Sequence, residues 1–127
     1  MIEKDDWLIG LCLEEASRLP SHYSTRVFAV AIDKKGLVIS GRGNTFTKTH
    51  PTQKKWACLA KEPERQYLHA EISVMVNALK TGRTIDKIVI GRVDKMGNKK
   101  DAAPCPVCKL FLETEFPDVE IVYSKEN

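Results

Sequence analysis

The first third of the chain shows a helical pattern and then a strand pattern. Apolar side chains recur at helical spacing within residues 4–18, and Pro20 ends that run. Two β-rich runs, 26–32 and 37–40, are joined by a four-residue connection that ends in Gly36, a residue suited to a turn with a positive φ. We therefore expect a helix followed by a β-hairpin.

Later segments alternate between helical and strand patterns. Residues 66–80 carry apolar side chains at helical spacing and are followed by Thr81 and Gly82, and residues 85–93 form a near-continuous apolar run typical of a buried strand. A charged loop, a helix and a short strand complete the series: 94–103, 104–115 and 119–123. This order predicts an α/β fold with three layers, α/β/α, in which a β-hairpin is followed by α-β-α-β in a mixed sheet of four recognisable strands.

The segment between the hairpin and the second helix has no persistent periodicity. Glycine, threonine and proline interrupt residues 41–65 repeatedly. A connection of this length is usually functional, so we expect an irregular lid or substrate loop here.

Composition indicates an ordinary globular chain. Its 127 residues suit one domain, 1–127, and the net charge of +3 comes from lysines and arginines spread along the chain, which argues weakly against a dedicated nucleic-acid binder. The start of the chain is acidic, and no apolar run approaches the length of a membrane span. We expect a cytoplasmic protein with no membrane partner.

Two short motifs carry the chemistry, His69-Ala70-Glu71 and the Pro-Cys-Pro-Val-Cys run 104–108. Of four cysteines, Cys105 and Cys108 form a Cys-x-x-Cys pair, which in a reducing compartment indicates metal binding or redox chemistry, whereas Cys12 and Cys58 are expected to be small apolar residues. Thiolates in the first turn of a helix are favoured by the unpaired N–H groups there.

A zinc site can be assembled from these motifs. His69, Cys105 and Cys108 supply three ligands, which leaves a fourth position for a water whose pKa zinc lowers toward about 7. Residues two apart on a helix diverge by about 200 degrees, so Glu71 can reach past the metal that His69 binds. Glu71 is then the proton carrier of a hydrolytic site.

A His-x-Glu motif followed about 30 residues later by Pro-Cys-x-x-Cys is the signature of zinc-dependent nucleobase deaminases. The chain resembles the cytidine and deoxycytidylate deaminase superfamily over most of its length. The resemblance implies a cytidine-deaminase-like fold, in which zinc-activated water attacks C4 of cytosine while Glu71 transfers protons and ammonia leaves. It also implies that Asn44 contacts the sugar, although a turn residue in a Gly-rich stretch is the alternative, and that Ala70 is a second substrate-binding position.

Free-nucleoside cytidine deaminases usually have cysteine at the position of His69. The His-Ala-Glu motif therefore resembles the deoxycytidylate, tRNA-adenosine and polynucleotide-editing branches of the superfamily. The expected loop offers four groups that could hold a 5′-phosphate or simply be solvated: Lys48, His50, Lys54 and Lys55. The favoured function is deamination of a cytosine nucleotide, dCMP to dUMP. Trp56 and Tyr67 could stack on a base or cover the core.

Three alternatives stay open. A polynucleotide deaminase acting on single-stranded DNA, RNA or tRNA would need a continuous basic groove, for which the candidates are Lys48, Lys54, Lys55, Lys95, Lys99 and Lys100. A nucleoside deaminase and a non-catalytic zinc-stabilised module are the others. The sequence leaves no room after Tyr123 for a further helix and strand, so the substrate-binding pieces that larger deaminases carry there must come from elsewhere or be absent. A neighbouring subunit is one source, and we expect a homo-oligomer.

Overall fold

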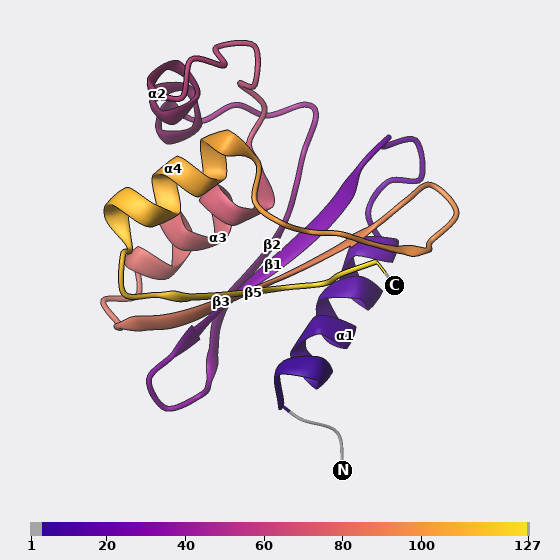
Figure 1. Ribbon diagram of the computed structural model, residues 1–127, viewed down its shortest axis with the longest axis horizontal. Helices are drawn as coiled ribbons and strands as arrows, with labels where there is room; N and C mark the ends of the chain where they lie inside the picture. The colour runs from indigo at the N-terminus through magenta and orange to yellow at the C-terminus, as the bar shows by residue number, and fades with distance from the viewer. Residues whose placement is uncertain (1–3, 127) are drawn as a thin grey trace.

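Four helices and five strands follow one another in the computed structural model, which describes residues 4–126 (Figure 1). Residues 1–3 and 127, the ends of the expected domain 1–127, lie outside the described residues. In chain order the elements are α1 (Lys4–Ser17), β1 (Arg26–Asp33), β2 (Val38–Gly43), α2 (Pro51–Leu59), α3 (Ala70–Leu79), β3 (Ile85–Val93), β4 (Lys99–Lys100), α4 (Pro106–Glu115) and β5 (Glu120–Tyr123).

The sheet is mixed, as predicted, and β3 lies at its centre. Strand β1 pairs antiparallel with both β2 and β3, whereas β5 pairs parallel with β3. Strand β4 pairs antiparallel with the end of β3, so β4 and β5 share one side of that strand. The sheet therefore has five strands where the sequence pattern predicted four, because a two-residue strand leaves no periodicity.

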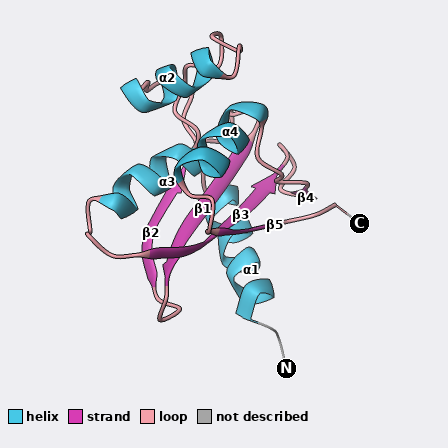
Figure 2. Ribbon diagram, turned by 60° about the vertical axis from the view of Figure 1, so that its left-hand side comes forward, coloured by secondary structure: helices cyan, strands magenta, loops and turns pink. Residues whose placement is uncertain are grey.

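Helices cover both faces of the sheet, which confirms the three predicted layers (Figures 1 and 2). Helix α1 packs on β1 and β3 through Leu8 and Cys12, and α3 covers the opposite face through residues such as Ile72 and Met75. At Gly91 on β3 the two layers approach so closely that a Cβ atom would lie 2.8 Å from Cys12 Cβ. Helix α4 lies beside α3, and α2 packs on α4.

Local signals placed most boundaries correctly. Gly36 has a φ of 83° in the β1–β2 turn, and Gly82 has a φ of 72° just after α3. The second strand is longer than expected, since it continues to Gly43, and α3 begins at Ala70 instead of residue 66. Of the two cysteines outside the motif, Cys12 on α1 is buried, whereas Cys58 on α2 is exposed.

The prediction of an irregular loop over 41–65 is wrong, because α2 lies within it. His50 caps this helix through its Nδ1 atom, which accepts a hydrogen bond from the backbone N–H of Thr52, and Pro51 occupies the first turn. The buried face of α2 consists of Gln53, Trp56 and Ala57. One of these is polar and one is small, which conceals the helical spacing.

Candidate metal centre and substrate cavity

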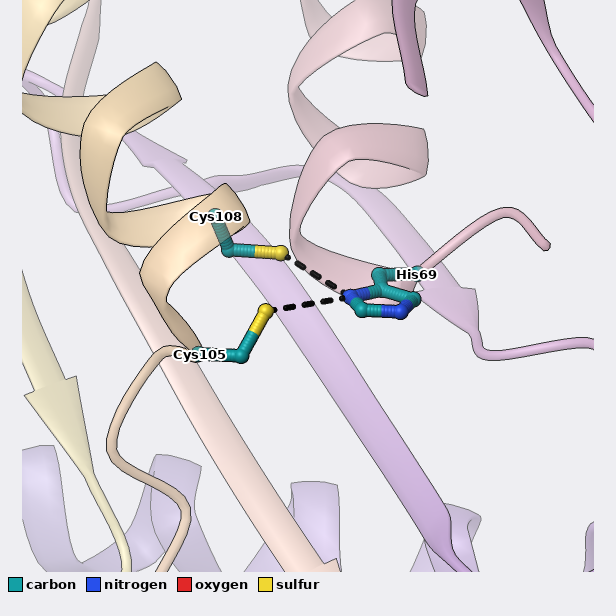
Figure 3. A group of neighbouring side chains, drawn as sticks. All are labelled: His69, Cys105 and Cys108. Atoms are coloured by element: carbon teal, nitrogen blue, oxygen red, sulfur yellow. Dashed lines mark hydrogen bonds between the residues drawn. The ribbon is translucent and has the colours of Figure 1, made fainter. Parts of the chain in front are cut away.

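Two helix N-termini bring three metal-ligating side chains together. His69 is the N-cap residue of α3, Cys105 is the N-cap residue of α4, and Cys108 lies in the first turn of α4. The Nδ1 atom of His69 lies 3.3 Å from the Cys108 sulfur and 3.4 Å from the Cys105 sulfur (Figure 3). Neither cap side chain bonds the helix it precedes, so both face the shared site.

This arrangement fits zinc. The ligand atoms of His69, Cys105 and Cys108 all lie within 4.8 Å of one another. Tetrahedral zinc, with Zn–S distances of about 2.3 Å and Zn–N distances of about 2.0 Å, requires nitrogen and sulfur ligands roughly 3.5 Å apart. The separations in this site already match that requirement. In the described part of the chain the cluster contains three such residues, the number typical of catalytic zinc.

The two thiols differ sharply in proton affinity. The hydrogen bond from Cys108 and the neighbouring His69 lower the pKa of Cys105 to about 4 against the opposing effect of burial. Burial and the adjacent Cys105 raise the pKa of Cys108 well above its ordinary value. One thiol therefore carries the negative charge and the other the proton, and a divalent cation removes this competition because it deprotonates the thiols it binds.

Glu71 stands in the first turn of α3, beside the metal ligands. Glu71 is only 7% exposed, yet it lines the cavity together with His69 and Cys105. Burial raises the pKa of the Glu71 carboxyl. A buried carboxyl beside the metal ligands is placed to accept and to donate protons at the reacting atoms, which suits a general acid and base.

Gln53 is a positioning residue that sequence reasoning missed. It is fully buried, accepts a hydrogen bond from the backbone N–H of His69 at 3.1 Å, and donates one to the carbonyl of Arg65 at 2.9 Å. Helix α2 thus holds the start of α3 in place. No local signal identifies this role, because both partners lie in a segment more than ten residues away.

A cavity of about 490 Å³ opens beside the N-termini of α3 and α4, near the start of β1 and the ends of β2 and β3. This volume lies within the usual range of roughly 300–1,000 Å³ for small-molecule sites. Its lining consists of Thr25, Val27, Asn44, Thr45, Phe46, Glu64, Arg65, Tyr67, His69, Glu71, Arg92, Ala102, Ala103 and Cys105.

Two expected substrate positions differ in their access to this cavity. Asn44 lines it, and the Asn44 side chain also joins two strands by accepting from the backbone N–H of Val27 and donating to the carbonyl of Thr25. Ala70 is fully buried and is not among the lining residues. Trp56 is a core residue that packs against Phe111, whereas Tyr67 is half-exposed and lines the cavity.

None of the four expected phosphate-binding residues lines the cavity: Lys48, His50, Lys54 and Lys55. The side chain of His50 caps α2, and Lys55 lies over the ring of Trp56 at 5.3 Å. The cations that line the cavity are Arg65 and Arg92 instead. Their positions could not be inferred from spacing, because Arg92 reaches the cavity through the order of the strands and Arg65 through the course of the segment between α2 and α3.

A mixed sheet covered by helices, with His-Cys-Cys ligands and a buried carboxylate at one cavity, defines a zinc-dependent hydrolase. The chain belongs to the family described as the cytidine and deoxycytidylate deaminase zinc-binding region, which it matches over residues 2–124. It is accordingly a zinc-dependent hydrolytic deaminase, acting on a small-molecule or nucleic-acid substrate. No curated protein matches the chain at a significant level. Within the described residues no helix is long and apolar enough to cross a membrane.

Proposed function

We propose that the chain, as a single domain over residues 1–127, deaminates a cytosine nucleotide, converting dCMP and water into dUMP and ammonia. The observation that carries this proposal is the position of Glu71, a buried carboxyl that lines the same cavity as the ligands His69 and Cys105. A cavity of about 490 Å³ suits a single nucleotide.

Each residue has a defined part in the proposed reaction. His69, Cys105 and Cys108 would hold zinc, which when bound supplies Lewis-acid activation of water at neutral pH. Glu71 accepts one proton from the attacking water and passes it to N3 of the ring, and it then moves the second proton of that water from the C4 hydroxyl to the departing amine. The C4–N bond breaks as the new C4–O bond becomes the carbonyl of uracil, so the reaction consumes one water and releases one ammonia.

Asn44 is the proposed sugar contact. Its amide oxygen and nitrogen each make one bond to the β1 segment. An amide oxygen has a second lone pair and an amide nitrogen has a second hydrogen, so both atoms can still bond a sugar hydroxyl. The bonds to β1 hold the amide in one orientation, which lowers the entropy lost on binding.

The positions of the lysines support a small substrate over a polynucleotide. Lys54 and Lys55 are on α2, whereas Lys99 and Lys100 form β4, and α2 and β4 lie on different sides of the molecule (Figures 1 and 2). None of the six lysines considered for a basic groove lines the cavity. We also propose a homo-oligomer, since β5 pairs only with β3 among the described strands.

An ammonia-release assay tests the substrate assignment. The zinc-loaded protein would be offered dCMP, CMP, dCTP, deoxycytidine, cytidine and a cytosine-containing oligonucleotide. We expect the highest kcat/KM with dCMP. A preference for the oligonucleotide or for a nucleoside would contradict the nucleotide assignment while leaving the deaminase chemistry intact.

A further inference from the structure

Arg92 is distinguished from the other arginines by its lack of partners. The chain has six arginines, all within residues 4–126. Five of them bond a carboxylate, a carbonyl or an amide through the guanidinium group: Arg18, Arg26, Arg42, Arg65 and Arg83. Among the described residues, the Arg92 side chain has no hydrogen bond and no ion pair, and it lines the cavity that contains Glu71.

The neighbours of Arg92 make its charge unfavourable in the protein alone. In the β3–β4 ladder Arg92 stands opposite Lys100, and like charges in directly opposed positions destabilise a sheet. Lys100 is compensated by Glu126 at 2.9 Å and by Asp94 at 4.0 Å. Arg65, the other cation of the cavity, is paired with Glu62. Of the two arginines in the cavity wall, Arg92 is thus the one without a compensating partner among residues 4–126.

Arg92 also has a defined position relative to the proposed sugar contact. In the sheet Arg92 pairs with Val27, whose backbone N–H donates to the Asn44 side chain at 2.8 Å. Asn44, Val27 and Arg92 therefore form one row across three adjacent segments, and strand spacing places its two ends about 10 Å apart. A ligand that lies along this row has the proposed sugar contact at one end and a guanidinium at the other.

We propose that Arg92 binds the phosphate monoester of the substrate. This inference rests on the proposed function, because it names the group that distinguishes a nucleotide from a nucleoside at the same site. A guanidinium can donate two parallel hydrogen bonds to phosphate oxygens, and such charge-assisted bonds are stronger than neutral ones. The phosphate site is then on β3, and not on the loop and helix that carry Lys48 and Lys54.

Product binding tests this assignment without turnover. Calorimetric titrations would compare dUMP with deoxyuridine on the zinc-loaded wild type, on Arg92→Gln, and on Arg42→Gln as the matched control, since Arg42 bonds Asn77 away from the cavity. We expect Arg92→Gln to weaken dUMP binding by about 10- to 100-fold and to leave deoxyuridine binding unchanged. Arg42→Gln should change neither, and Arg92→Lys should retain part of the preference.

In these titrations, two results would overturn the role of Arg92. One is a wild type that binds dUMP no more tightly than deoxyuridine, and the other is an Arg92→Gln variant that retains the full preference or loses both ligands equally. These outcomes differ from a failure of the proposed function, which would appear as a wild type that releases no ammonia from dCMP whatever its affinity for dUMP. A higher kcat/KM for an oligonucleotide that depends on Arg92 would also overturn the assignment, because it would indicate a phosphodiester.

Discussion

Replacing Gln53 with leucine tests whether α2 positions the metal-binding histidine. The Gln53 side chain is fully buried and accepts from the backbone N–H of His69. Leucine has a similar volume, so the substitution leaves no large cavity, but it removes the partner of that N–H group. The carbonyl of Arg65 loses its partner too, although Arg65 is exposed and its carbonyl can bond water instead.

The expected loss of stability follows from one hydrogen-bond donor, the backbone N–H of His69, which is left without a partner. A partly buried N–H without a partner costs about 1–3 kcal/mol, and the second lost bond adds little where water replaces it. For a chain of this size, each kcal/mol shifts the melting temperature by roughly 4 °C. We therefore expect Gln53→Leu to lower the melting temperature of the zinc-loaded protein by roughly 4–12 °C. Weaker zinc binding should accompany the loss, because the start of α3 becomes less well ordered.

The assay is thermal and denaturant unfolding of the zinc-loaded protein, together with a zinc-affinity titration. Gln66→Leu is the matched control, because Gln66 is exposed in the same part of the chain. That variant should stay within about 0.5 kcal/mol of the wild type. If Gln53→Leu were as stable as Gln66→Leu and bound zinc equally well, the proposed support of His69 by α2 would be refuted.

Two further predictions concern the second motif and the hairpin turn. Cys108→Ala should lose zinc and, with it, the stabilisation that bound zinc provides, about 4 kcal/mol at a thousandfold excess of zinc over Kd. The control Cys58→Ala changes an exposed cysteine and should retain both the zinc and the stability. Metal analysis with thermal unfolding checks this, and a zinc-replete Cys108→Ala protein would contradict it. The backbone N–H of Leu37, together with Lys35 and Arg83, lowers the pKa of Asp33, so its carboxylate stabilises the fold above the unfolded pKa near 3.9 and this contribution is lost as pH falls through the folded pKa. Asp33→Asn should therefore be less stable than the wild type at pH 7, with a difference that shrinks in acid; a difference that stays constant with pH in unfolding titrations would refute the role.

Features encoded within a few neighbouring residues were predictable from the sequence. The β1–β2 turn depends on Gly36, and both chemical motifs carry their own helix starts at His69 and Cys105. The convergence of the two motifs followed from their shared chemistry, since three zinc ligands must meet at one metal.

Features that depend on distant segments were not predictable. The buried face of α2 includes the polar residue Gln53, whose hydrogen-bond partners are His69 and Arg65, so the face does not show as an apolar pattern. Helix α2 also packs on α4, which is distant from it in the sequence. Arg92 looks like one exposed position in a strand until the strand order places it beside Val27 and the Asn44 side chain. The tertiary structure was therefore needed to identify the cations that line the cavity.

The most direct test of the deaminase account is a comparison of Glu71→Gln with the wild type by zinc content, folding and ammonia release from dCMP. Glutamine preserves the shape of the side chain but cannot carry the proton. We predict that the variant binds zinc with the same stoichiometry, folds normally, and loses about 10²- to 10⁴-fold or more in kcat. A zinc-loaded Glu71→Gln protein that releases ammonia at the wild-type rate would contradict the central role of this carboxyl.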